Sequence, residues 1–232
     1  MTTGDPSAVL AGDRSSLARA GTAERVAQIL RQRITEGVFL PGTRLSEPAI
    51  SGALGVSRNT LREAFQLLAH ERLAVRELNR GVFVRELTAP DIEDLYRIRR
   101  MVECAAVREA ADREGPVLTG LEGALATGKL AAAAEDWQTV ATASIQWHQA
   151  LSELAGSDRV AGTMRQVLAE TRLFFVLTES TRAFFEPYLA RHEKINGHLR
   201  RRRFDLAEQA LERYLRDAER QLLAAYHRRE TS

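Results

Sequence analysis

The first turn of one predicted helix concentrates side chains whose chemistry suits the reading of nucleic acid. The buried face of this helix takes Leu61, Ala64, Phe65 and Leu68 at helical spacing. Its first turn and opposite face present Arg58, Asn59, Thr60, Arg62 and Gln66. A guanidinium can bind O6 and N7 of guanine together, an Asn amide can read adenine, and short hydroxyls fit beside phosphates. The alternative interpretation is a solvated helix face with Arg–Glu pairs, such as Arg58 with Glu63.

The segments around this helix predict the framework that would present it. A helix over residues 22–39 and a short helix from Ser46 precede it, and Gly55 ends the second one. Ser57 starts the third helix at once. Two short strands follow, over residues 74–78 and 82–86, around the turn Asn79-Arg80-Gly81. This order of helix, helix, tight turn, helix and hairpin is typical of a winged helix-turn-helix.

A second set of polar side chains falls on the apolar stripes of predicted bundle helices. These helices lie near 91–114, 117–129, 133–155, 158–179, 183–203 and 204–228. The inward polar positions are Arg99, Ser144, His148, His192, Asn196 and Tyr214. A buried polar group without a partner costs about 1–3 kcal/mol, and a charged Arg costs more. A shared cavity for a polar or anionic ligand, water or a metal explains the set. Hydrogen bonds to neighbours at the bundle ends are the alternative.

Composition and charge limit the classes of protein to which the chain can belong. The chain has 232 residues, of which 44% are hydrophobic and 28% charged, as in globular proteins of one or two domains. Its single cysteine, Cys104, excludes an intramolecular disulfide framework and a multi-cysteine metal site. The sequence contains neither a run of about 18 apolar residues nor a secretory signal, so we expect no membrane partner. We expect a cytoplasmic, nucleoid-associated protein.

The patterns together predict a mainly α protein with two domains. Residues 1–21 form a flexible tail, and residues 22–86 form the winged helix-turn-helix with its small β-hairpin wing. Residues 87–90 are the linker, and residues 91–228 form an all-helical domain for effector binding and dimerisation. Residues 22–86 contain ten Arg against seven Asp and Glu. This small basic excess is compatible with nucleic-acid binding but is weak support for it.

Three stretches between Val26 and Arg85 carry a specific pattern: ITEGVFLPGTRLSE, LGVSRNTLREAFQLLAHERLAV and RGVFV. They resemble the DNA-binding domain of GntR-type bacterial transcription regulators, which implies that the third helix docks in the major groove. The chain departs from the family pattern at two positions, which bears on the operator sequence that it recognises. Pro48 stands where some members hold a base-contacting Arg, and Asn59 stands where Thr is common. The predicted DNA contacts are Arg44, Ser57, Arg58, Asn59, Thr60, Arg62, Arg80 and Gly81.

The stretches DLYRIRRMVECAAVREAA, WHQAL and HEKINGHLRRRRFDLAEQALERYL resemble the all-helical effector domain of the FadR-type (FCD) subgroup. Many members bind a divalent metal such as Zn, Ni or Mn through one Asp and three His. The positions here are Ser144, His148, His192 and Tyr214, so only the two histidines match. Ser is a poor ligand for such a metal and neutral Tyr is seldom one.

We therefore expect that no cofactor is required and that the cluster binds an effector directly. Ser144, His148, His192, Asn196 and Tyr214 would hydrogen-bond the effector, while the Arg99 guanidinium would pair with its carboxylate or phosphate. In the alternative, His148 and His192 hold a divalent ion, and that ion binds an effector carboxylate.

These observations favour an effector-controlled transcription regulator, and family behaviour favours a repressor. A homodimer would place two reading helices one turn apart on a palindromic operator. An enzyme using Ser144, His148, His192 and Tyr214 is an alternative, although no known catalytic motif surrounds them. A helical interaction protein that has lost DNA binding is another, and the intact turn over residues 57–62 argues against it. The effector, the operator and the regulated genes stay open.

Overall fold

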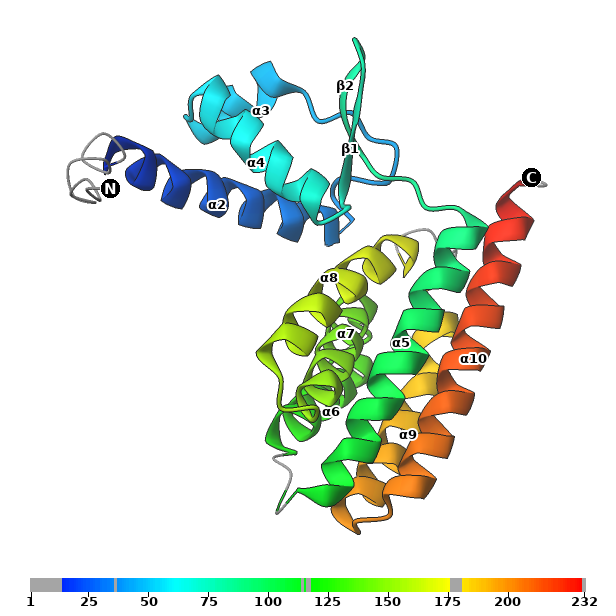
Figure 1. The fold of residues 1–232 in the computed structure, drawn as a ribbon. Helices are drawn as coiled ribbons and strands as arrows, with labels where there is room; N and C mark the ends of the chain where they lie inside the picture. The colour runs from blue at the N-terminus through cyan, green and yellow to red at the C-terminus, as the bar shows by residue number, and fades with distance from the viewer. Residues whose placement is uncertain (1–13, 36, 114, 116–117, 176–180, 231–232) are drawn as a thin grey trace, which may run out of the picture. The chain divides into compact units, whose positions relative to one another are not determined.

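The computed structural model describes residues 14–35, 37–113, 115, 118–175 and 181–230. The chain divides into two units, Met1–Glu86 and Leu87–Ser232. Helices dominate both units, and a small antiparallel two-stranded sheet completes the first (Figure 1). The predicted fold class, mainly α with a hairpin wing, is confirmed.

The first helix, α2, spans Arg14–Thr35 and differs from its prediction at both ends. Residues 1–13 of the predicted tail lie outside the described residues, whereas residues 14–21 form the first turns of α2. Leu17, Ala18 and Ala20 are strong helix formers, so the helix extends toward the N-terminus. At the other end, Gly37 takes φ of 78°, a left-handed conformation in which the helix cannot continue to residue 39.

The next two helices, α3 (Glu47–Leu54) and α4 (Arg58–His70), form the predicted helix-turn-helix. Gly55 ends α3 with φ of 63°, and its N–H donates to the Ser51 carbonyl. Ser57 then caps α4. The apolar face of α4 packs against α2, and its buried side chains include Leu61, Ala64, Phe65 and Leu68. The spacing predicted this face correctly.

Strands β1 (Ala74–Glu77) and β2 (Gly81–Val84) form the wing. They pair antiparallel with Glu77 opposite Gly81. Asn79 lies between them with φ of 60°, a conformation that Asn tolerates better than most residues. The segment 42–45 adds backbone hydrogen bonds along the other edge of β2, so both edges of this strand are held.

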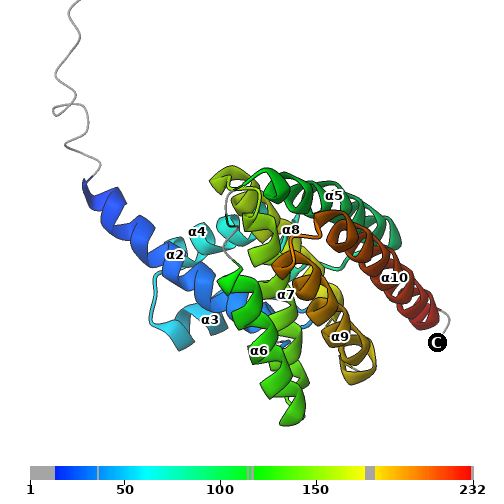
Figure 2. The ribbon, with the colours of Figure 1, turned by 90° about the horizontal axis from the view of Figure 1, so that it is seen from below.

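Helices α5 to α10 form the second unit. They span α5 Ala89–Glu109, α6 Thr119–Ala133, α7 Trp137–Glu153, α8 Asp158–Phe175, α9 Thr181–Arg200 and α10 Phe204–Glu230, and a 3-10 turn, η2, follows α5 at Ala110–Asp112. Within this unit α10 lies beside α5 and α9, and α6 lies beside α7 (Figures 1 and 2). Because α7 also contacts α5 and α9, the inward faces of these helices meet in one core.

The connection between the units is shorter than the predicted linker 87–90. Helix α5 begins at Ala89, because Thr88 and Asp91 form a capping box. The Thr88 hydroxyl accepts from the Asp91 N–H at 3.4 Å, and the Asp91 carboxylate accepts from the Thr88 N–H at 2.8 Å. Pro90 fits the first turn, where its missing N–H is not needed. Only Leu87 and Thr88 therefore lie between Glu86, the last residue of the first unit, and the start of α5.

The predicted end of a helix near residue 129 is wrong, because α6 continues to Ala133. Gly128 lies inside α6, where a Cβ would be 3.1 Å from Leu189 Cδ2 and 3.5 Å from Ala143 Cβ. This glycine therefore allows close packing against α7 and α9 and does not stop the helix. The end of the predicted helix 158–179 and the start of the predicted helix 117–129 lie outside the described residues.

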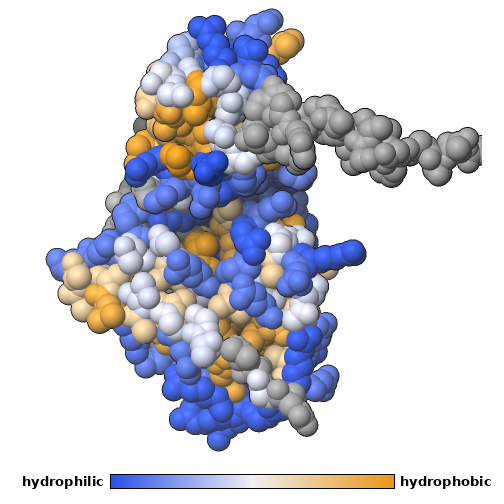
Figure 3. Space-filling view, turned by 90° about the vertical axis from the view of Figure 1, so that its left-hand side faces the viewer, coloured by the Kyte–Doolittle hydropathy of each residue, from blue (hydrophilic) through white to orange (hydrophobic). Residues whose placement is uncertain are grey.

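Among the described residues, no helix has the length and apolar character needed to cross a membrane. On the face drawn in Figure 3, hydrophobic areas are interspersed with hydrophilic ones.

Candidate nucleic-acid interface and effector site

The start of α4 is held by two of the residues predicted to contact DNA. The Ser57 hydroxyl accepts from the Thr60 N–H at 3.1 Å, and the two hydroxyl oxygens are 2.8 Å apart. Thr60 is only 8% exposed. These two residues therefore fix the first turn, and the exposed Arg58 and Asn59 are carried on it.

Carboxylates hold three of the predicted reading side chains. The Asn59 amide donates from Nδ2 to Glu63 Oε1 at 2.9 Å. The Arg62 Nε donates to Glu47 Oε2 at 3.2 Å, and Arg80 pairs with Glu77 in the wing. The expected alternative pair, Arg58 with Glu63, does not form, and within the described chain Arg58 has no ion pair. Among the arginines predicted to contact DNA, Arg44 and Arg58 therefore have no ion pair within the described residues, whereas Arg62 and Arg80 do.

The wing tip brings Arg44, Arg80 and Gly81 together. The backbone of Arg44 forms an isolated antiparallel β-bridge with the backbone of Phe83 in β2. The Arg80 guanidinium lies 5.4 Å from the Phe83 ring centroid. Gly81 has φ of 115°, and a Cβ there would lie 3.3 Å from Arg44 Nε. The wing tip thus favours glycine because of its backbone conformation, and a Cβ there would also displace the flexible Arg44 side chain slightly.

In the second unit, five buried side chains form one continuous chain of polar contacts. Arg99 Nε donates to Glu103 Oε1 at 2.8 Å, and Glu103 Oε2 lies 2.6 Å from His148 Nδ1. The Tyr214 hydroxyl lies 3.1 Å from His148 Nε2 and 3.1 Å from His192 Nε2. These residues come from α5, α7, α9 and α10, and none is more than 4% exposed.

The other two predicted effector residues adjoin this chain on different sides. Ser144 is buried, and its hydroxyl partly offsets the effect of burial on the pKa of Tyr214. Asn196 accepts from Trp147 Nε1 at 3.0 Å and donates to the Leu121 carbonyl at 3.3 Å. The Trp147 ring stacks on His192 with centroids 4.1 Å apart. Asn196 therefore positions Trp147 and, through it, the His192 ring.

Burial sets the charges in this cluster. Burial and the nearby Arg99 charge lower the pKa of His148 although Glu103 acts to raise it, and burial holds the pKa of His192 well below its ordinary value. Burial also raises the pKa of Tyr214. Burial opposes the ionised form of Glu103, but His148 and Arg99 outweigh it, so that the pKa of Glu103 is lowered. The cluster therefore contains a buried Arg–Glu ion pair beside two neutral imidazoles and a neutral phenol.

Neutral imidazoles allow one consistent order of hydrogen bonds. Glu103 accepts from His148 Nδ1–H, which leaves His148 Nε2 as an acceptor for the Tyr214 hydroxyl. The Tyr214 oxygen then accepts from His192 Nε2–H. In each of these three hydrogen bonds, one donor therefore faces one acceptor.

The donor set does not fit a first-row divalent metal. Both Nε2 atoms point at the Tyr214 hydroxyl, and a phenol with a raised pKa stays protonated. Ser144 supplies only a neutral hydroxyl at the remaining position. Nowhere in the described part of the chain are three or more His, Cys, Asp or Glu side chains grouped to hold a metal ion.

Glu103 is a member of the cluster that the sequence prediction missed. It is completely buried and contacts both Arg99 and His148. The available signal was its position four residues after Arg99 on the same helix, where an acid and a base lie on one face.

One polar atom of the cluster is buried without a hydrogen-bond partner among the described residues. Arg99 is 1% exposed, and its Nη2 is a buried atom without a hydrogen-bond partner among the described residues. The guanidinium lies 4.8 Å from the Tyr96 ring centroid. An unpartnered buried donor costs about 1–3 kcal/mol, which an acceptor oxygen placed there would recover.

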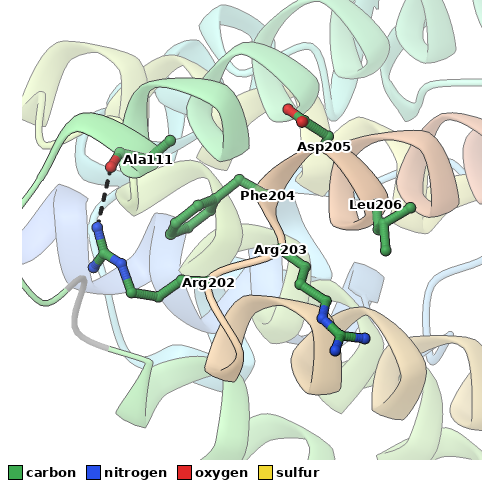
Figure 4. A pocket seen from close by; sticks show the side chains of 6 residues that line it. All are labelled: Ala111, Arg202, Arg203, Phe204, Asp205 and Leu206. Carbon is green, nitrogen blue, oxygen red and sulfur yellow. Dashed lines mark hydrogen bonds between the residues drawn. The ribbon is translucent and has the colours of Figure 1, made fainter.

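An open pocket of about 440 Å³ lies elsewhere in this unit, at the turn between α9 and α10 (Figure 4). Arg202 in this turn has φ of 54°, and its Nη2 donates to the Ala111 carbonyl at 3.2 Å. Its Nη1 donates to the Arg113 carbonyl at 3.4 Å. These bonds satisfy carbonyls near the end of η2, so Arg202 has a structural role there. None of the predicted effector residues lines this pocket.

Comparisons with known proteins match both halves of the chain. The family model described as bacterial regulatory proteins, gntR family, matches residues 22–84, and the model described as FCD domain matches residues 94–217. A solved structure titled as a GntR transcriptional regulator from Rhodococcus sp. RHA1 is 47% identical to this chain. That alignment covers 88% of this chain and 98% of the Rhodococcus chain, with a TM-score of 0.84.

Curated relatives match over different lengths. RspR of Escherichia coli K12, named an HTH-type transcriptional repressor, is 27% identical over 195 residues, which is 84% of this chain and 86% of RspR. YdhC of Bacillus subtilis strain 168, named an HTH-type transcriptional regulator, is 36% identical over 83 residues. That match covers 36% of this chain and only 37% of YdhC. The names of these relatives describe regulators and not enzymes.

Proposed function

The chain belongs to the GntR family of bacterial transcription regulators and joins a DNA-binding winged helix-turn-helix to an FCD effector domain, and we propose that it is an effector-released repressor. A homodimer binds a palindromic operator and leaves it when a small metabolite occupies the buried polar cluster. The name of RspR, a repressor similar over 84% of this chain, supports the sign of the response.

The unpartnered Nη2 of buried Arg99 is the observation that carries the effector site. Its donors favour an acceptor oxygen, and a guanidinium binds carboxylates and phosphates in two places. His148, His192 and Tyr214 lie along the same chain of contacts and can exchange their mutual hydrogen bonds for bonds to a ligand. Ser144 and Asn196 complete the proposed site.

Helix α5 connects the proposed effector site with the DNA-binding unit along the chain. This helix carries both Arg99 and Glu103 and begins directly after the two connecting residues. A ligand that binds one arrangement of α5 more tightly than another shifts the population of DNA-binding dimers by that difference in affinity, and by no more.

The test of this function is a binding measurement with the full chain and its own upstream DNA. We expect the protein to prefer one fragment over random duplex at moderate salt, and a metabolite extract to weaken that complex. Equal affinity for every fragment, with and without extract, contradicts the proposal.

The Arg99→Lys variant tests the anion role. Lysine keeps a positive charge beside Glu103 but removes the Nη2 donors, so we expect affinity for the effector to fall roughly tenfold or more. Calorimetry with inorganic phosphate and a panel of small carboxylates would measure this. The exposed Arg97→Lys on the same helix is the matched control. Equal affinity in all three proteins rejects Arg99 as the contact.

The metal alternative is tested by restoring the family ligands. We expect the wild-type chain, purified without an affinity tag, to contain well under one Zn, Ni or Mn per chain, and Zn²⁺ to leave its Tm unchanged. The double variant Ser144→Asp/Tyr214→His should gain stoichiometric Zn²⁺, because one carboxylate and three imidazoles form a usable donor set. One tightly bound metal per wild-type chain would overturn the metal-free proposal.

A further inference from the structure

The contact between Asn59 and Glu63 fixes how the DNA-reading amide is turned. Asn59 Nδ2 donates to Glu63 Oε1 at 2.9 Å, one helical turn along α4. An ionised carboxylate only accepts hydrogen bonds. The nitrogen end of the amide must therefore face Glu63, because the opposite orientation would bring the amide oxygen against a carboxylate oxygen.

The backbone that carries Asn59 is also fixed. Ser57 and Thr60, on either side of it, are bonded to each other through the cap of α4. Arg58 does not compete for Glu63 in the structure, and Asn59 itself is exposed. The amide is therefore presented to solvent in one orientation from one position.

This orientation leaves one N–H and the carbonyl oxygen of Asn59 available for a base. Adenine offers the matching pair in the major groove, with N7 as an acceptor and the N6 amino group as a donor. Guanine offers two acceptors, N7 and O6, so the outward amide oxygen would meet O6 without a hydrogen. A freely turning amide could instead donate to guanine.

We infer that Glu63 is a specificity-determining residue, which holds the Asn59 amide so that one position of each operator half-site is read as adenine and guanine is rejected. The inference rests on the proposed binding of operator DNA by this surface. Glu63 acts through Asn59 and needs no contact with the base.

The experiment measures the affinity of the full chain for its operator and for every single-base substitution in one half-site, by fluorescence anisotropy. For the wild type we expect one adenine whose replacement by guanine weakens binding by about tenfold. Replacing that adenine by 7-deazaadenine, which lacks N7, should also weaken binding. In Asn59→Ala both effects should fall below twofold.

Glu63→Gln is the decisive variant. Its side chain can donate as well as accept, so the Asn59 amide can turn over, and discrimination between adenine and guanine should fall below twofold at this position only. Glu24→Gln, on α2, removes the same charge from the same unit and should keep the full discrimination. Thermal unfolding of each variant shows whether the fold is kept.

The outcomes separate this inference from the function on which it rests. Operator binding with an adenine preference that survives Glu63→Gln removes Glu63 from the reading of this base. Operator binding without any adenine position that responds to Asn59→Ala overturns the whole inference. A lack of preference for any fragment over random duplex contradicts the proposed function instead.

Discussion

Replacing Glu103 by Ala is expected to lower the free energy of unfolding by about 3–5 kcal/mol. Arg99 and Glu103 are 1% and 0% exposed, and their side chains are 2.8 Å apart. Without the carboxylate, a buried guanidinium loses its counter-charge and His148 Nδ1 loses its acceptor. Domains are commonly stable by only about 5–15 kcal/mol, so this single change can leave much of the second unit unfolded. Urea unfolding followed by circular dichroism would measure it.

Two further variants separate loss of the ion pair from loss of an acidic residue. Glu93→Gln lies on the exposed side of the same helix and should change stability by less than about 0.5 kcal/mol. The double variant Arg99→Met/Glu103→Leu removes both charges and should recover much of the stability that Glu103→Ala loses. A loss below about 1 kcal/mol in Glu103→Ala would show that the Arg99 charge is compensated in another way.

The same ion pair predicts how stability changes with acid. Although burial alone would raise it, the pKa of Glu103 is lowered from 4.5 by His148 and Arg99. The folded state therefore holds the proton less tightly than the unfolded state. The contribution of ionised Glu103 to the free energy of unfolding is fully present above about pH 4.5, and it is lost as the pH falls through the lowered pKa. Unfolding curves between pH 6 and pH 3 should show a smaller loss in Arg99→Met/Glu103→Leu than in the wild type.

Helical periodicity predicted which positions face the bundle core, because side-chain direction follows directly from spacing along a helix. Arg99, Ser144, His148, His192, Asn196 and Tyr214 are all buried as expected. Periodicity does not predict partners across helices, since these depend on how α5, α7, α9 and α10 are turned against one another. Glu103 was missed for this reason, and so was the role of Asn196 in holding Trp147.

Glycine shows a similar division between local and tertiary causes. Gly55 and Gly81 have positive φ, and both were predicted correctly from turn chemistry. Gly128 has the same identity but lies in the middle of α6. The close approach of Leu189 and Ala143 explains a glycine at this position, and both of these residues are far from Gly128 in the sequence. A glycine that makes room for a neighbouring helix cannot be distinguished from a helix stop without knowing the neighbour.

Arg58→Ala is expected to reduce discrimination between the operator and random duplex by roughly 10- to 100-fold, which corresponds to about 1–3 kcal/mol. Arg58 is exposed on the first turn of α4, and within the described residues it has no ion pair, unlike Arg62 and Arg80. Binding DNA therefore breaks no contact of Arg58 inside the protein. Anisotropy titrations with both duplexes at several salt concentrations would measure the ratio.

Arg25→Ala is the control, because Arg25 is an exposed residue of α2 and its loss removes one positive charge from the same unit. If Arg58 reads a base, its loss weakens operator binding far more than random binding, whereas Arg25→Ala weakens both alike or neither. If Arg58 contacts only phosphate, both affinities fall together and the salt slope decreases by about one. The ratio of the two affinities, rather than either alone, therefore decides whether Arg58 contributes sequence recognition or only attraction to the backbone.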